Sequence, residues 1–172
     1  VKEMVQGRLD SFFDFGANTQ EMIDLRDRYG FRRQDTDTAS VQGALAVQAL
    51  TKGISRCVSI RVANALDTHF DDWSSDQGPR QAGGFEVVGS MMRELDAMEY
   101  KGTGKSWLDH TVIVGFSEFS RTPLINVRGG RDHSLTNACF VAGGNVKGNQ
   151  VIGASSDLAL QPRKTNLTTG LA

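Results

Sequence analysis

The stretch Thr111-Val-Ile-Val-Gly-Phe116 is a short and almost wholly apolar run in a chain of 172 residues. Such runs are typical of strands that helices cover on both faces, as happens in parallel sheets. The polar segment Ser117-Glu-Phe-Ser-Arg-Thr-Pro123 follows directly. The predicted strand, 108–116, therefore ends beside an acid, Glu118, at the edge where open α/β sheets bind their ligands.

The segment before this region is predicted to be helical as far as residue 54. Asn18 and Glu21 fit a capping box, and Gly30 marks the end of that helix. A second helix is expected to start after Asp37 and to stop at Lys52-Gly53. The chain is accordingly divided into a helical segment, 1–54, and an α/β portion, 55–172, that carries the metal site.

Periodicity assigns the remaining elements. Alternating apolar residues predict a strand at 56–62, and a polar composition with one proline predicts a loop at 71–84. An apolar stripe rich in methionine predicts a helix from 85 to 98. Two further short strands are expected at 138–142 and 151–152.

The order strand, helix, strand predicts a right-handed βαβ crossover, and the later strands would extend the same sheet. The predicted fold class is therefore α/β, with a mostly parallel sheet flanked by helices.

Oxygen and nitrogen ligands cluster after two of these strands. Asp67 and His69 are two residues apart, so their side chains share one face if the chain is extended there. Glu118 follows the apolar run, and Asp132-His133 lies in a loop that Gly129 and Gly130 are expected to make mobile. Carboxylates and imidazoles suit zinc, manganese or calcium, so these five residues are predicted to bind a divalent metal of undetermined identity.

Other interpretations remain open for single residues. Asp67 could start a turn, and Asp132 could pair with Arg131 or cap a helix. Arg121 and Arg131 flank the acids and could bind an anionic substrate group, with help from Asn126, or could simply neutralise the acids.

Charge and composition narrow the partners. With 39% apolar and 23% charged residues the chain is an ordinary globular domain, and a net charge of −1 gives no electrostatic case for binding nucleic acid or an anionic membrane. No apolar run approaches the roughly 18 residues that a transmembrane helix needs.

Several ordered motifs resemble a known family. They are Leu66-Asp-Thr-His69, Ser117-Glu-Phe-Ser-Arg-Thr-Pro123, Gly130-Arg-Asp-His133, and Ala142-Gly-Gly-Asn-Val-Lys-Gly148 with Gln150-Val-Ile-Gly153. Together they resemble DUF1501, a bacterial family of sulfatase-like proteins of unknown function that are remote relatives of the alkaline phosphatase superfamily. The likeness covers about residues 38 to 170.

This resemblance implies an incomplete sulfatase-like domain with one or two metals at the carboxyl ends of its strands. Asp67 and His69 would be the first ligand group, Glu118 the acid after the later strand, and His133 the last histidine. Asp132 would be an added ligand or would orient His133.

The sequence departs from the superfamily pattern in two places. Phe119 stands where a histidine often follows the later acid, so a complete two-zinc site is not expected. The superfamily's nucleophile, a Thr, Ser or formylglycine-forming Cys, lies near the first strand, and residues 1–54 show no such segment.

Family members are longer and often carry a twin-arginine export signal. The chain begins at Val1 rather than Met and ends at Gly170-Leu-Ala172, so we expect a C-terminal-side portion of one longer polypeptide. The resemblance further implies a periplasmic or extracellular location.

Two functions follow from these expectations. The first is metal-dependent hydrolysis of small anionic substrates, namely sulfate or phosphate esters. The alternative is a non-catalytic sulfatase-like subunit or scaffold that binds a protein partner in an exported assembly.

Overall fold

A computed structural model describes residues 9–158 and 160–172. Its described residues form two compact units. The first comprises the chain up to Leu66 together with Gly78–Trp107, and the second comprises Asp67–Gln77 and the part from Leu108 onward. The sequence-based division at residue 54 remains a prediction.

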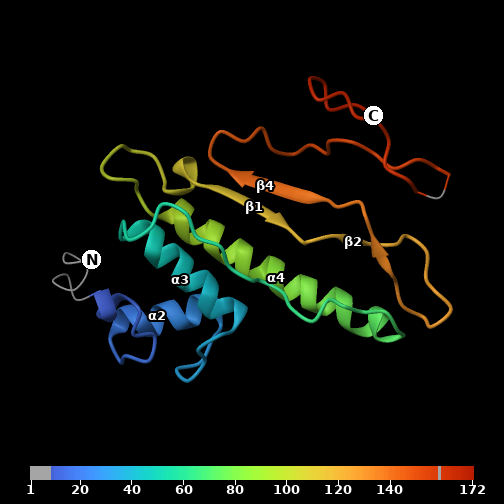
Figure 1. Ribbon diagram of the computed structural model, residues 1–172. Helices are drawn as coiled ribbons and strands as arrows, with labels where there is room; N and C mark the ends of the chain where they lie inside the picture. Colours follow the sequence, from blue (N-terminus) through green and yellow to red (C-terminus); the bar gives the residue numbers. More distant parts are fainter. Residues whose placement is uncertain (1–8, 159) are drawn as a thin grey trace. The chain divides into compact units, whose positions relative to one another are not determined.

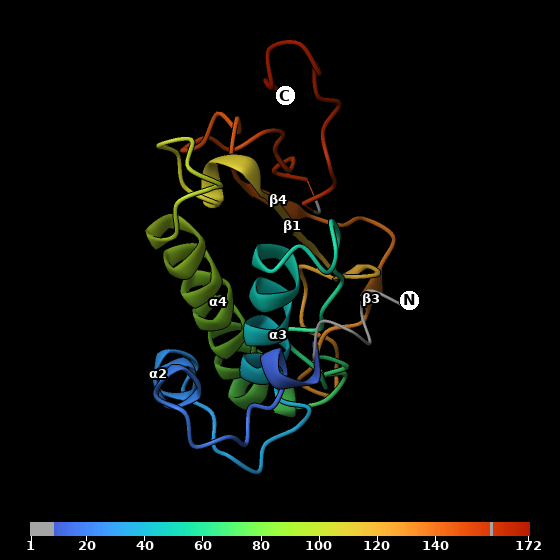
Figure 2. The same ribbon diagram turned by 90° about the vertical axis from the view of Figure 1, so that its left-hand side faces the viewer.

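Helices build the first unit. A 3₁₀ helix, η1 (Leu9–Phe12), precedes α2 (Gln20–Tyr29) and α3 (Ala39–Thr51), and most of α4 (Asp72–Ala97) also belongs here. The three α-helices lie side by side in both views (Figures 1 and 2). Their contact faces form the core, whose fully buried side chains include Leu25, Val47 and Leu95.

The caps explain where α2 and α3 begin and end. Thr19 caps α2 by accepting a hydrogen bond from the Met22 N–H, and Thr38 caps α3 in the same way. Gly30, in the left-handed region at φ 67°, ends α2 as predicted. The predicted Asn18 cap is wrong by one residue, because the Thr19 hydroxyl has the position that reaches the N–H of the third helical residue.

Two local predictions failed around α4. The segment predicted as a loop, 71–84, is instead the first half of the helix, which continues through Pro79. A proline removes one helical hydrogen bond but does not forbid a helix that tertiary contacts hold. One such contact is at Gly84, where an added Cβ would lie 2.9 Å from the Val62 carbonyl oxygen.

The strand predicted at 56–62 is also absent. Those residues pair with no strand in the described part of the chain, and one of their amides, that of Arg61, donates to the Gln42 side chain instead. Alternation of apolar residues favours an extended chain, but a strand also requires a partner for its backbone.

The second unit contains two short antiparallel ribbons. After the 3₁₀ helix η2 (Leu108–His110), β1 (Val112–Phe116) pairs with β4 (Cys139–Gly143) in a register that joins Val114 to Val141. The second ribbon joins β2 (Ser120–Arg121) to β3 (His133–Ser134). Figure 1 shows β1 and β4 running side by side.

These pairings contradict the predicted fold class. Both ribbons are antiparallel, no parallel sheet forms among the described residues, and 151–152 is not a strand. The chain is therefore not the mostly parallel, alkaline-phosphatase-like α/β domain that was expected. The strand predicted at 108–116 forms only at Val112–Phe116, where exposed and half-buried residues alternate, and its partner lies across an antiparallel ladder rather than beyond a crossover helix.

No helix among the described residues combines the length and the apolar character that crossing a bilayer requires.

Candidate metal centre

Three side chains of the second unit bring potential ligand atoms together. The Asp67 carboxylate oxygen Oδ1 lies 3.1 Å from His69 Nε2 and 3.4 Å from His133 Nε2. The two imidazole Nε2 atoms are 3.0 Å apart. The three atoms therefore form a compact triangle with one oxygen and two nitrogens, a set that could hold a metal ion.

The ribbon of β2 and β3 presents one side of this triangle. Arg121 and His133 are directly opposite each other in its register, so both side chains project from the same face. Phe119, just before β2, packs its ring against the His133 imidazole with 4.1 Å between ring centroids. This contact restrains the His133 imidazole, which projects from β3.

The segment 67–70 supplies the other side. It is attached to the loop between β2 and β3 by a backbone bridge from Phe70 to Gly129 and by a hydrogen bond from the Arg131 N–H to the Thr68 carbonyl, 3.2 Å. Thr68 is fully buried and donates to Gln77 Oε1, 2.9 Å away. Because its neighbours Asp67 and His69 point the other way, both reach the triangle.

Gly130 allows this attachment. A Cβ at this position would overlap the backbone of His69 and Phe70, so no larger residue fits without moving the segment. The two glycines that predicted a mobile loop instead permit a close approach of two backbones.

His69 is oriented from behind by Asp132. The His69 Nδ1 atom lies 3.0 Å from Asp132 Oδ1, and the Asn126 amide donates to the same oxygen at 3.0 Å and to the His69 carbonyl at 3.1 Å. An ionised carboxylate only accepts hydrogen bonds, so the proton of neutral His69 lies on Nδ1. The lone pair of Nε2 then faces the triangle, which is the arrangement of a metal-binding histidine with a carboxylate partner.

Both carboxylates of the site stay ionised more readily than usual. Hydrogen bonds from Arg121 and then from His133 lower the pKa of Asp67. Hydrogen bonds from His69 and then from Asn126 lower the pKa of Asp132. Each acid is therefore a charged acceptor at neutral pH.

Arg121 contacts two corners of the triangle. Its Nη2 atom donates to Asp67 Oδ1 at 2.6 Å, and its Nη1 atom lies 3.2 Å from His69 Nε2 and 3.1 Å from the Arg131 carbonyl. Only 13% of this side chain is exposed. The guanidinium is thus held against the ligand atoms rather than extended into solvent.

The other predicted site residues lie elsewhere or have different roles. Glu118 is exposed and is not part of the triangle. Arg131 donates to the carbonyls of Thr122 and Pro123 and stacks over the Trp73 ring, so its contacts are to backbone and to an aromatic face. Asn126 lies at the site, where it binds Asp132.

Sequence reasoning missed the residues that assemble the site. Thr68, Gln77 and Phe119 were not predicted to position the cluster, although Thr68 lies between the two predicted ligands and a buried residue there would force them to one side. The contact of Phe119 with His133 has no local sequence signal.

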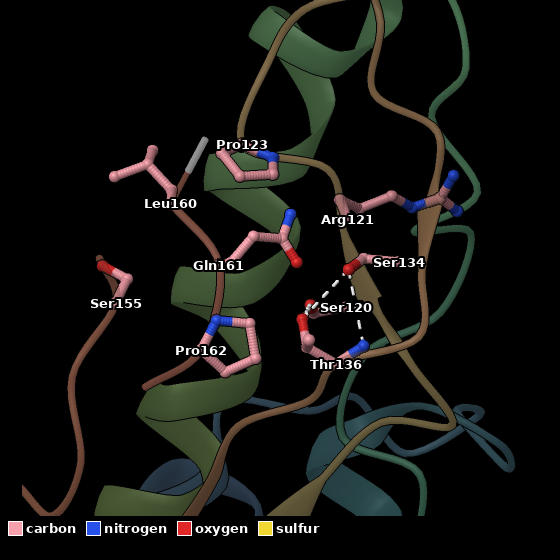
Figure 3. A pocket seen from close by; sticks show the side chains of 9 residues that line it. All are labelled: Ser120, Arg121, Pro123, Ser134, Thr136, Ser155, Leu160, Gln161 and Pro162. Carbon is pink, nitrogen blue, oxygen red and sulfur yellow. Dashed lines mark hydrogen bonds between the residues drawn. The ribbon is translucent and has the colours of Figure 1, made fainter. Parts of the chain in front are cut away.

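A pocket of about 300 Å³ lies on the opposite face of the same ribbon. Ser120 and Ser134, which pair with each other, line it together with Thr136 and the segment 160–162. Neighbouring strand residues face opposite ways, so this hydroxyl face turns away from Arg121 and His133. Arg121 also lines the pocket, but Figure 3 shows its guanidinium pointing away from the other lining side chains, and it shows the hydrogen bonds of the Ser134 hydroxyl.

Comparison with known proteins identifies the family. The family model described as a protein of unknown function, DUF1501, matches residues 3–169. The chain belongs to the DUF1501 family. No curated protein and no solved structure matches it.

The match confirms the predicted resemblance to DUF1501. It gives no link to the sulfatase or alkaline phosphatase superfamily. The described strands of this DUF1501 chain form two antiparallel ribbons and no mostly parallel sheet, so the fold does not support a relationship to that superfamily. Its function must therefore be argued from the site.

Proposed function

We propose that Asp67, His69 and His133 bind one divalent metal ion, and that this centre serves the hydrolysis of sulfate or phosphate esters. The observation that carries the proposal is the contact between Asp132 and His69. When His69 is neutral and donates from Nδ1 to this carboxylate, its Nε2 lone pair is directed at the other ligand atoms, as metal binding requires.

The donor set favours zinc. Two imidazoles and one carboxylate are common zinc ligands, whereas calcium prefers a shell of oxygens alone. Zinc bonds of about 2.0–2.1 Å in a tetrahedron place neighbouring ligand atoms about 3.3 Å apart, close to the 3.0, 3.1 and 3.4 Å between the three atoms of the triangle. Manganese is the second choice, because the carboxylate suits manganese but the two imidazoles suit zinc better.

Three protein ligands fit a reactive centre better than a structural one. Structural zinc sites usually have four protein ligands, and catalytic sites keep one position for water or substrate. When bound there, the metal would supply Lewis-acid polarisation of an ester oxygen and activation of a water or hydroxyl nucleophile. The chain's own contribution is the fixed His69 imidazole and the cationic Arg121 beside the ligands.

A second candidate is a non-catalytic subunit that binds a protein partner. The observation that favours it is the exposure of apolar side chains on β1 and β4, including Val112, Phe116 and Val141. A location outside the cytoplasm, in the periplasm or beyond, is compatible with both candidates and remains a prediction from the family resemblance.

Hydrolysis assays on the purified chain with zinc separate the two candidates. Aryl sulfate and aryl phosphate esters are the substrates, and His69→Ala and His133→Ala are compared with Glu118→Ala as the matched control. The proposal expects zinc-dependent hydrolysis that both histidine variants lose and the control keeps. Zinc-independent turnover, or hydrolysis unchanged in both histidine variants, would contradict it.

A further inference from the structure

Arg121 and a metal ion require the same electron pair. In neutral His69, the tautomer that donates from Nδ1 to Asp132 leaves one lone pair and no proton on Nε2. The Arg121 Nη1 atom lies 3.2 Å from that nitrogen, and arginine can only donate. A lone pair that accepts this N–H cannot also bind a metal.

The overlap extends to the carboxylate. Arg121 Nη2 donates to the same Asp67 oxygen that completes the triangle, at 2.6 Å. The guanidinium therefore spans two of the three ligand atoms. It also carries the positive charge that would repel a cation there.

We propose that Arg121 is an internal competitor for the metal site and that, once displaced from His69 and Asp67, its guanidinium binds the anionic group of the substrate. This inference rests on the proposed metal centre. The displaced side chain still starts from β2, opposite His133, and so remains beside the metal ligands. Guanidinium groups bind phosphate and sulfate oxygens in a two-pronged way, so the displaced group meets the anion at the centre.

The consequence is positive coupling between metal and anion. An oxyanion that holds Arg121 removes the competitor and raises the affinity for the metal, and the metal raises the affinity for the anion by the same factor. A site of this kind binds the two together more readily than either alone.

Zinc affinity measured against a chelating dye tests the idea on the full chain. Titrations are run in sodium chloride and in sodium sulfate at equal ionic strength, with wild type, Arg121→Ala, Arg121→Lys and Arg128→Ala. Arg128 is the matched control because its guanidinium lies over the Phe70 ring, 4.8 Å from its centroid, and removing it changes the net charge equally.

The expected results are specific. In chloride, Arg121→Ala binds zinc about tenfold more tightly than Arg128→Ala, the size expected when a charge-assisted hydrogen bond no longer competes. Sulfate tightens zinc binding by wild type and by Arg128→Ala, and it has less effect on Arg121→Ala. Arg121→Lys keeps the charge but not the two-pronged contact, so its zinc affinity falls between those of wild type and Arg121→Ala. It replaces Arg121→Ala in the comparison if the alanine variant does not fold.

The failures of the two proposals are distinguishable. If wild type does not bind zinc, or if His69→Ala binds zinc as tightly as wild type, the proposed metal centre is contradicted. If wild type binds zinc through His69 but Arg121→Ala binds no more tightly than Arg128→Ala, the competition is overturned. A sulfate effect of the same size with and without Arg121 would overturn the anion role.

Discussion

Among single residues, Asp132 determines most of the behaviour of the site. It lies behind His69, on the side away from Asp67 and His133, yet it determines the tautomer and the direction of the neutral His69 ring. Asn126 in turn holds Asp132 and the His69 backbone, so the orientation depends on two linked contacts. Carboxylate partners of this kind commonly matter for metal affinity almost as much as the ligands.

Replacement of Asp132 tests this dependence. We expect Asp132→Asn to weaken zinc binding about 10- to 100-fold, because the neutral amide no longer holds the Nδ1 proton firmly. Zinc titration of the purified variant measures the change, with Glu118→Gln as the control that loses an acid outside the triangle. An unchanged affinity in Asp132→Asn would show that the contact does not orient the ligand.

Acidification gives a second test of the same contact. The pKa of Asp132 is lowered in the folded chain from its ordinary value of 3.8, so its interaction with His69 contributes stability above that value and loses it as the pH falls through the folded pKa. The difference in unfolding midpoint between wild type and Asp132→Asn should be constant above about pH 5 and should narrow below about pH 4. A difference in unfolding midpoint that grows on acidification would contradict a lowered pKa for Asp132.

Much of the residue cluster was predictable from the sequence. Asp67 and His69 were predicted from their spacing and Asp132-His133 from its place in the glycine loop, and the structure places these four residues together. Glu118 was predicted from its position after a strand and lies outside the triangle, because the expected convergence depended on the strand ends of a parallel sheet that the described residues do not form.

At the scale of elements, the site depends on the joining of two segments far apart in sequence. Gly130 is the point of closest approach, where its backbone meets that of His69 and Phe70. The nearby bridge between Phe70 and Gly129 holds the two segments in register. Neither contact is encoded by local periodicity, so the two glycines on their own predict only a mobile loop.

Adding one methyl group should open this junction. Gly130→Ala is expected to destabilise the fold by about 1–3 kcal/mol and to weaken zinc binding, because the new Cβ overlaps backbone that cannot rotate away. Gly148→Ala is the control, since nothing lies within 4 Å of its added Cβ. Thermal unfolding and zinc titration measure both effects, and equal behaviour of the two variants would contradict the close approach.

The helical unit offers a matching pair. An added Cβ at Gly43 of α3 would lie 2.6 Å from Val87 of α4, so Gly43→Ala should destabilise the chain by about 1–3 kcal/mol. Gly83 of α4 has open space around its Cβ position, so Gly83→Ala should stabilise by about 0.5–1 kcal/mol through helix propensity. Urea unfolding gives both values, and the same sign for both would contradict the packing described.

The elements themselves were predictable where local chemistry decides them. Gly30 ends α2, α3 begins after Asp37, and the apolar run places β1, whereas the cap of α2 was predicted one residue too early. The first half of α4 and the absent strand at 56–62 were not predictable, since contacts with other segments determine both.

For the whole molecule, composition and strand order were insufficient to fix the topology. The predicted crossover required parallel neighbours for β1, and its neighbour is β4 in an antiparallel ladder. The DUF1501 family has no known function, and the feature of this chain that indicates a chemistry is the cluster of Asp67, His69 and His133.

Zinc content combined with X-ray absorption at the zinc edge tests that cluster most directly. The zinc-loaded wild-type chain should contain one zinc per chain with two imidazoles among its nearest ligands. His69→Ala and His133→Ala should each lose an imidazole signal and most of the bound zinc, while Glu118→Ala should retain both. A chain that binds no zinc, or whose zinc spectrum is unchanged in both histidine variants, would contradict the metal centre.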